Sequence, residues 1–415
     1  MSSISGTTRR SDLNGCVRIG IDATCCFNRR GYGRFTRQLL HEMVRRHPQH
    51  KYVCLVDQDP PPGTLPEGVE VVNANPARKV CESAVADGRR TLGEMYAFTR
   101  LVRRIKADVF FFPAIYSFFP VPPGTRSVVC IHDTIAENLP ELIFTSRTTR
   151  WAWRAKVRVA LWQATRVMTV SESSRAGIQR HFGRDSDLVT EGPSNIFGLG
   201  EPDSIEATLR SFGLADRPYV LFVGGISPHK NLTTLISAMK AVREAHDVRL
   251  VIVGDSNADG FRNNAAELQA QIDDAGVRES CVFMGFLPDD QLADLYRGAR
   301  CLVFPSLCEG FGLPAIEAMA CGTAVLASDN SSLPEVVGDA GLFFDPLDAT
   351  EMGNKIIKLL DDEELRAELE RKGLERSRGF TWELAADMAM KSLMKAATHG
   401  SGQRVVNSRP SESAP

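Results

Sequence analysis

Short apolar runs alternate with segments of helical spacing through the first half of the chain. The apolar runs are residues 17–22, 51–56, 69–72, 109–112, 128–131 and 167–170, and the helical segments include 35–44, 89–106, 147–163 and 171–181. Such alternation predicts strands joined by helical crossovers, which build a parallel sheet that is covered on both faces.

The alternation stops in residues 193–217 and then starts again. This stretch contains no candidate strand and has Pro and Gly at both ends, so a domain junction is expected there. Beyond it, apolar runs at residues 219–223, 250–253, 282–284, 301–304 and 324–327 alternate with helical segments near 232–245, 265–275, 289–297, 314–320, 349–360 and 363–371. Two successive α/β units of this kind place a ligand at the carboxyl ends of their strands, in the cleft between them.

The expected organisation of the chain has six parts. They are a flexible start (1–15), a first Rossmann-like domain (16–195), a linker (196–217), a second Rossmann-like domain (218–380), a last amphipathic helix (381–398) and a disordered tail (399–415).

Residues 302–319, LVFPSLCEGFGLPAIEAM, contain the candidate site. A strand is followed by turn-forming residues, and Pro314 suits the start of a helix whose cap would be Leu313. Leu313 has no side-chain acceptor, so the first N–H groups of the helix are available to an anion. Glu317 is the first charge after Glu309, and a carboxylate among Ala, Ile and Met is costly unless a partner hydrogen-bonds it.

Spacing alone leaves two interpretations of this stretch open. In the first, it is an ordinary βα unit that carries a surface Glu. In the second, it is a phosphate-and-hydroxyl site in which Glu309 and Glu317 accept hydrogen bonds from one ligand. Gly310 and Gly312 flank Phe311 and would let the backbone approach that ligand closely.

The run EGFGLPAIE, from Glu309 to Glu317, resembles the Glu-x7-Glu motif of retaining glycosyltransferases of family 4, together with the FPS before it and the ACG after it. The resemblance implies the GT-B fold, an α/β architecture in which two Rossmann-like doubly wound domains face a central cleft. The first domain would bind the acceptor, the second would bind the donor, and the last helix would cross back onto the first domain.

The same resemblance implies roles for individual residues. Glu317 would accept from the ribose hydroxyls of a nucleoside-diphosphate sugar, and Glu309 would act at the transferred sugar as a catalytic group. Backbone N–H groups at Phe311, Gly312 and Leu313 would hold phosphate or sugar oxygens. The nucleotide sugar is the substrate, so no cofactor is implied.

A second motif, VLFVGGISPHKNL, follows an apolar run and opens a helix. A Lys at such a place can contact a phosphate as a point charge, although an isolated loop Lys is more often a solvated residue. The motif resembles the diphosphate-binding loop of the family, which implies that Lys230 neutralises the donor diphosphate. Many members carry an Arg where this chain has Gly225, and His229 is the candidate for a partial substitute.

The motif Gly31-Tyr-Gly33-Arg34 precedes a helix in the first domain. It does not satisfy the dinucleotide-binding pattern GxGxxG, because the third position of that pattern is Thr36. A plain turn is one interpretation. The motif also resembles the first-domain glycine loop of family 4, which implies that Gly31 and Gly33 lie against the donor phosphates when the cleft closes.

His132 ends an apolar run, a place where a histidine is usually a satisfied structural residue. The resemblance instead implies that His132 faces the transferred sugar. The pairs Asp57-x-Asp59 and Asp185-x-Asp187 match the metal-holding carboxylates of the other large glycosyltransferase fold. Asp59 leads into three prolines, as a surface turn would, and we expect no metal.

Positive charge is concentrated in the first half of the chain. Residues 1–190 hold 28 Lys and Arg against 17 Asp and Glu, although the whole chain has a net charge of only −2. Within residues 147–163, four arginines share one helix face and Trp151 lies on the neighbouring face; the arginines are Arg147, Arg150, Arg154 and Arg158. This pattern suits contact with an acceptor or an anionic membrane surface, and a core helix with a solvated basic face is an equal alternative.

Three features of the sequence bear on the cellular compartment of the protein. The ten cysteines form no CxxC pair and no metal-ligand spacing, the chain opens without an apolar leader, and it contains no run of 18 apolar residues. These features predict a cytoplasmic protein that is at most peripheral at the cytoplasmic face of the inner membrane.

The sequence therefore indicates a metal-independent hexosyltransferase that takes a nucleotide sugar and a glycan or lipid-linked acceptor, with no nucleic-acid partner. The motifs VGGISPHKNL and GYGRF resemble members that transfer mannose or a related deoxyhexose from GDP donors in bacterial lipopolysaccharide O-antigen or exopolysaccharide synthesis. The alternatives are a UDP-sugar-dependent enzyme of the same fold, a non-catalytic sugar-nucleotide-binding protein and a dinucleotide-dependent oxidoreductase.

Overall fold

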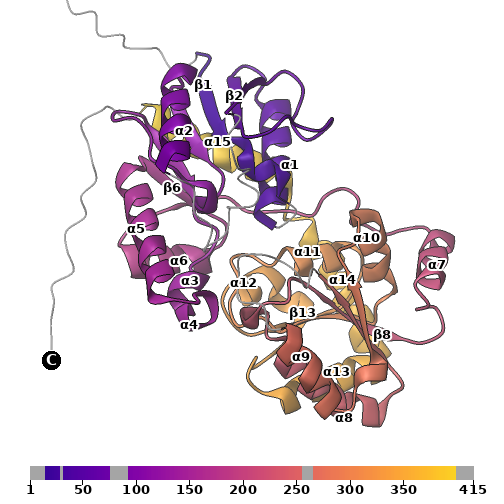
Figure 1. Ribbon diagram of the computed structural model, residues 1–415. Helices are drawn as coiled ribbons and strands as arrows, with labels where there is room; N and C mark the ends of the chain where they lie inside the picture. The colour runs from indigo at the N-terminus through magenta and orange to yellow at the C-terminus, as the bar shows by residue number, and fades with distance from the viewer. Residues whose placement is uncertain (1–14, 29–30, 75–91, 255–264, 399–415) are drawn as a thin grey trace, which may run out of the picture.

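The computed structural model describes residues 15–28, 31–74, 92–254 and 265–398. These residues form two lobes, each built on one parallel sheet with helices on both faces (Figure 1). The predicted fold class, two doubly wound α/β domains, is confirmed.

The first lobe contains a seven-stranded sheet in the order β3-β2-β1-β4-β5-β6-β7. Its strands are β1 (Arg18–Asp22), β2 (Lys51–Val56), β3 (Glu70–Asn73), β4 (Val109–Phe112), β5 (Ser127–Cys130), β6 (Arg166–Thr169) and β7 (Asp187–Leu188). Its helices are α1 (Gly31–Arg46), α2 (Leu92–Ile105), α3 (Ile135–Asn138), α4 (Pro140–Ile143), α5 (Arg147–Gln163) and α6 (Glu172–Phe182). All four residues of the central strand β4 are buried, which explains its unbroken apolar sequence VFFF.

The second lobe contains a six-stranded sheet in the order β10-β9-β8-β11-β12-β13. Its strands are β8 (Tyr219–Val223), β9 (Arg249–Val253), β10 (Cys281–Gly285), β11 (Cys301–Phe304), β12 (Val325–Ser328) and β13 (Gly341–Phe344). Its helices are α7 (Pro202–Ser211), α8 (Leu232–Ala245), α9 (Ala265–Asp274), α10 (Asp289–Gly298), α11 (Leu313–Ala320), α12 (Leu333–Val337), α13 (Ala349–Asp361) and α14 (Glu363–Ser377).

Each sheet reverses its strand order at one place, and this is where open α/β sheets bind ligands. The reversal lies between β1 and β4 in the first lobe and between β8 and β11 in the second. The loops that leave the carboxyl ends of β8 and β11 carry Lys230 and Glu309, respectively. The sequence of strands therefore places both residues at one edge of the second sheet.

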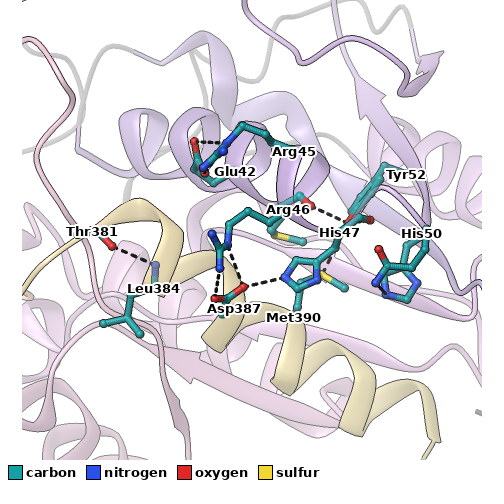
Figure 2. A network of polar contacts seen from close by, with 12 residues as sticks. Glu42, Arg45, Arg46, His47, His50, Tyr52, Thr381, Leu384, Asp387 and Met390 are labelled. Atoms are coloured by element: carbon teal, nitrogen blue, oxygen red, sulfur yellow. Dashed lines mark hydrogen bonds and ion pairs between the residues drawn. The ribbon is translucent and has the colours of Figure 1, made fainter. Parts of the chain in front are cut away.

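The last helix, α15 (Trp382–Thr398), packs against α1 of the first lobe. Figure 2 shows the polar contacts that hold it there. The Asp387 carboxylate accepts hydrogen bonds from Arg46 at 3.0 and 2.6 Å and lies 3.0 Å from Nε2 of His47. Ala385, Ala386 and Ala389 of the same helix are fully buried. The chain therefore crosses between the lobes twice, before α7 and before α15.

Three local expectations differ from the structure. Helix α1 begins at Gly31, so the two glycines of GYGR belong to its first turn and not to a preceding loop. The expected linker contains α7, which packs against α10 of the second lobe. Strand β13, with the sequence GLFF, was not expected and extends the second sheet by pairing with β12.

Candidate functional site

The loop between β11 and α11 brings the expected motif to the boundary between the lobes. Helix α11 begins at Leu313, and its cap is Gly312, not Leu313 as expected. Gly312 has φ of 114°, and a Cβ there would lie 2.8 Å from Leu333. A glycine is therefore required at this position. Because glycine also lacks a side-chain acceptor, the first N–H groups of α11 still depend on an acceptor from elsewhere.

Lys230 and Glu309 lie together in this site. Nζ of Lys230 is 2.6 Å from Oε1 of Glu309, and their side chains are 18% and 10% exposed. The two loops that carry them are bound to each other, because the Asn231 amide donates to the Pro305 carbonyl oxygen at 3.0 Å. The interpretation of Lys230 as a fully solvated residue is therefore wrong.

Glu317 lies inside the protein, with a side chain that is 2% exposed. Its Oε2 accepts a hydrogen bond from the Tyr296 hydroxyl at 3.1 Å. Burial raises the pKa of Glu317 to about 7, although the Arg34 guanidinium opposes this shift, and Asp289 adds to it. The interpretation of Glu317 as a surface residue is therefore wrong.

Arg34 reaches Glu317 from the other lobe. Its Nη1 donates to Oε1 of Glu317 and its Nη2 to Oδ1 of Asp289, at the start of α10. The guanidinium carbon also lies 5.4 Å from the ring centre of Phe197 in the segment that joins the lobes. One side chain of α1 thus contacts three segments beyond the first lobe.

Gly310 is in close contact with the first lobe. A Cβ at Gly310 would lie 2.6 Å from the main-chain oxygen of His132. The Gly310 carbonyl oxygen accepts hydrogen bonds from Ser171 and Ser174, with Oγ–O distances of 2.6 and 3.1 Å. Ser171 also caps α6, so one side chain both starts this helix and joins the lobes.

His132 is buried between protein acceptors of the first lobe. Its Nε2 lies 2.8 Å from the Pro113 carbonyl oxygen, and its Nδ1 lies 3.4 Å from the Glu191 carboxylate. Burial lowers the pKa of His132, but Cys130 and Glu191 outweigh burial and raise it above the usual value. The expected role of His132 at the transferred sugar stays a prediction.

A cavity of about 370 Å³ adjoins Glu309 between the lobes. The first lobe contributes Thr134, Asn138 and Arg180 to its lining, and the second contributes Glu309 and Ser331. A larger cavity of about 700 Å³ is lined by residues of the two segments that join the lobes and by Gln38 and Glu42 of α1, and neither expected glutamate lines it. The smaller cavity therefore adjoins Glu309, whereas Lys230 and Glu317 line neither cavity.

Two family models match the chain. The model described as Glycosyl transferases group 1 matches residues 205–376, and the one described as Glycosyl transferase 4-like domain matches residues 30–191. O-antigen chain mannosyltransferase B of Escherichia coli is 33% identical over 262 residues, which are 62% of this chain and 67% of that protein. The chain belongs to the group 1 glycosyltransferases.

Two further comparisons set limits on what the likeness shows. The serotype-specific mannosyltransferase WbdA of Escherichia coli is 33% identical over 242 residues, 56% of this glycosyltransferase but only 29% of WbdA. Sucrose-phosphate synthase from Thermosynechococcus elongatus matches with a TM-score of 0.71 at 22% identity, over 91% of this chain and 98% of the other. At that identity the match shows the shared GT-B fold.

The two DxD pairs of this glycosyltransferase include carboxylates that are bound by neighbouring side chains. In the described part of the chain, no group of three or more His, Cys, Asp or Glu side chains could hold a metal ion. Asp187 is instead bound by Arg166, with both N–O distances 2.6 Å, and Asp59 accepts from Asn73 at 2.9 Å.

Helix α5 of the glycosyltransferase lies on the side of the first lobe away from the second lobe (Figure 1). Trp153, Val157, Ala160 and Leu161 form its buried face. Trp151 and Trp162 are 73% and 65% exposed, and the four arginines of the same helix lie on the exposed side; they are Arg147, Arg150, Arg154 and Arg158. The exposed tryptophans show that this side of α5 is not part of the core. None of the described helices is long and apolar enough to cross a bilayer.

Sequence reasoning assigned no role to several residues that the structure brings to the site. Arg34 stood in a noted motif, but its two carboxylate partners are 255 and 283 residues away in the sequence. Glu335 of α12 accepts from the backbone N–H groups of Glu172 and Ser173 at 2.8 and 3.1 Å, and thereby caps α6 of the other lobe. Contacts of this kind depend on how the lobes meet, for which the sequence carries no local signal.

Proposed function

We propose that this glycosyltransferase moves a hexose from a nucleoside-diphosphate sugar to a growing glycan or lipid-linked acceptor in O-antigen or exopolysaccharide synthesis. The donor we favour is GDP-mannose or the GDP derivative of a related deoxyhexose. The observation that carries the proposal is the convergence of Lys230, Glu309 and Glu317 around the start of α11. The names of the mannosyltransferases that resemble this chain support the choice of sugar and pathway.

Each residue has a chemical task in this proposal. Glu317 accepts from the ribose hydroxyls, Lys230 neutralises the diphosphate, and the N–H groups at the start of α11 hold phosphate or sugar oxygens. Gly31 and Gly33, in the first turn of α1, allow close approach to the donor from the first lobe. Because the leaving diphosphate gains negative charge, donors that are already in place stabilise it best in a cleft that excludes water.

The proposed reaction retains the configuration of the sugar. The acceptor oxygen bonds to the anomeric carbon on the face from which the diphosphate departs, and a phosphate oxygen of the leaving group takes the acceptor proton. Glu309 hydrogen-bonds the sugar hydroxyls and stabilises positive charge at the anomeric carbon. His132 orients the sugar from the first lobe. The reaction uses neither a cofactor nor a metal ion.

The test is a thermal-shift panel in EDTA with GDP, UDP, ADP, NAD, GDP-mannose and UDP-glucose, on wild type and Glu317→Ala. A ligand at a hundred times its dissociation constant adds about 2.7 kcal/mol of stability, which is easily seen. The proposal expects GDP and GDP-mannose to stabilise wild type but not the variant. A shift with UDP and UDP-glucose alone would indicate a UDP-sugar enzyme, and a shift with NAD alone would indicate an oxidoreductase.

Turnover separates an enzyme from a silent binding protein. With GDP-mannose and a lipid-linked glycan acceptor, release of GDP in EDTA is expected for wild type and not for Glu309→Gln. NMR of the product should show the anomeric configuration of the donor. Nucleotide binding without any GDP release would support the non-catalytic alternative, and activity that returns only after metal is restored would overturn metal independence.

The exposed side of α5 suits contact with the acceptor's membrane. Four arginines attract anionic headgroups, and the exposed indole rings of Trp151 and Trp162 suit the interfacial region of a bilayer. We place the reaction at the cytoplasmic face of the inner membrane on this basis. Wild type should sediment with phosphatidylglycerol vesicles and not with phosphatidylcholine vesicles. Trp151→Ser with Trp162→Ser should lose this binding, whereas Leu347→Ser, which alters another exposed apolar residue, should keep it.

A further inference from the structure

Arg34 is the one guanidinium in the described part of the chain that bridges Glu317 to a second carboxylate. It stands on α1 of the first lobe, and both of its partners belong to the second. Its side chain is 18% exposed and that of Glu317 is 2% exposed, so this ion pair is largely shielded from water. Removing the cation from such a pair leaves a buried carboxylate without its partner, which costs more than breaking a surface pair.

The start of α1 is held rigidly, and this fixes where Arg34 points. A Cβ at Gly33 would lie 2.0 Å from the main-chain oxygen of Asn28, so only glycine allows this packing. Arg37, one turn further along α1, donates to the carbonyl oxygens of Cys26 and Asn28 at 2.6 and 2.9 Å. The helix therefore presents Arg34 to the second lobe without needing to reorganise.

Arg34 leaves hydrogen-bonding capacity on Glu317 for a ligand. A carboxylate has about four lone-pair positions, and here one faces Arg34 and one faces Tyr296. The remaining positions can accept the two hydroxyls of a ribose. Other titratable groups that interact with Glu317 are Asp289 on α10 and Cys321 at the end of α11. Gly373 of α14 packs against Met319 of α11 and brings no charge there.

We propose that Arg34 is a positioning residue of the donor site: it holds the Glu317 carboxylate in place and favours its ionised form, so that the first lobe completes the nucleoside-binding site of the second. This inference rests on the proposed function of Glu317 as the ribose acceptor. The ion pair exists only when the lobes meet, so closure of the lobes and binding of the nucleoside each favour the other.

The test compares nucleotide binding by wild type, Arg34→Gln, Arg34→Lys and the matched control Arg45→Gln. Arg45 stands on the same helix and also pairs with carboxylates, Glu42 and Glu383, but its side chain is 60% exposed. Calorimetry with GDP at pH 7 should show a dissociation constant at least about tenfold higher for Arg34→Gln than for wild type. Arg34→Lys should fall between them, and Arg45→Gln should match wild type.

The pH profile distinguishes positioning from a merely structural role. Burial holds the pKa of Glu317 at about 7 in the presence of Arg34. Loss of the guanidinium therefore moves this pKa further up. GDP affinity of wild type should rise with pH through a midpoint near 7, and the midpoint for Arg34→Gln should lie at higher pH. A structural defect would weaken binding without moving the midpoint.

The outcomes separate the two proposals. If wild type binds neither GDP nor any other nucleotide of the panel, the proposed function fails. If wild type binds GDP and Arg34→Gln binds it equally well with the same midpoint, the inference about Arg34 fails and the proposed function stands. Tighter binding by Arg34→Gln would overturn the inference in a different way, because Arg34 would then be an occupant that the ribose must displace.

Discussion

Lys230 and Glu309 form an ion pair within the second lobe, with 2.6 Å between Nζ and Oε1. Lys230 therefore has two competing anionic partners in the proposed reaction, this carboxylate and the donor diphosphate. Phosphate oxygens must approach Lys230 while Glu309 turns toward the sugar. The ion pair thus holds both groups close to their working positions before the donor arrives.

Substitutions at these two residues should have opposite effects on nucleotide binding. Lys230→Met removes the cation, and we expect the dissociation constant for GDP to rise by roughly tenfold to a hundredfold. Glu309→Gln releases Lys230 from its partner, so GDP binding should be unchanged or tighter, while turnover falls at least a hundredfold. Calorimetry and a GDP-release assay measure the two effects. Equal weakening of GDP binding by both variants would contradict these roles.

Glu317 should make the stability of the unliganded protein depend on pH. Its pKa is about 7 in the folded state against 4.5 for an ordinary glutamate, so folding favours the protonated form. The resulting stabilisation is full below pH 4.5 and is lost as the pH rises through 7. The lost stability amounts to about 3 kcal/mol. Urea unfolding measures this effect in wild type and Glu317→Gln at pH 5 and pH 8. The free energy of unfolding of the variant, relative to that of wild type, should be higher at pH 8 than at pH 5.

The local parts of the site could be predicted from the sequence. Glu309, Glu317 and Lys230 each follow a strand that apolar composition marks clearly, and the topology of parallel sheets brings strand ends to one edge. The fold class followed from the alternation of apolar runs with segments of helical spacing. The residue at which α1 begins was harder to predict, because Gly31 and Gly33 lower helix propensity. The close packing of Gly33 against Asn28 accounts for a glycine in this first turn.

The contacts between lobes could not be predicted in the same way. Arg34 is an ordinary helix residue by its spacing, and Asp289 is an ordinary first-turn acid of α10. Their meeting depends on the relative placement of two domains. The environment of Glu317 could be predicted only in part. The apolar residues around it indicated a costly carboxylate, but they did not indicate the cation that compensates it. A single sequence carries no signal for such pairs.

Replacing Gly225 by Arg should strengthen diphosphate binding. A Cβ at Gly225 would meet no atom within 4 Å, so a side chain fits there without strain. The new guanidinium would add a charge-assisted hydrogen bond to phosphate, and we expect roughly tenfold tighter GDP binding. Gly225→Gln, which adds length without charge, is the control. The gain should shrink at high salt, and no gain at low salt would show that this loop does not face the diphosphate.

Replacing Gly310 by Ala should disturb the contact between the lobes without unfolding either one. The added Cβ would lie 2.6 Å from the His132 carbonyl oxygen, so the Glu309 loop or the first lobe must shift. The hydrogen bonds from Ser171 and Ser174 to Gly310 would be lost or lengthened with it.

A displacement of about 1 Å in a reacting group can cost about a hundredfold in rate, so we expect turnover of Gly310→Ala to fall by tenfold to a hundredfold. Gly198→Ala, whose Cβ enters open space, should keep both turnover and lobe arrangement. Small-angle scattering should show a larger radius of gyration for Gly310→Ala than for the control, and equal turnover in the two variants would mean that this contact does not position Glu309.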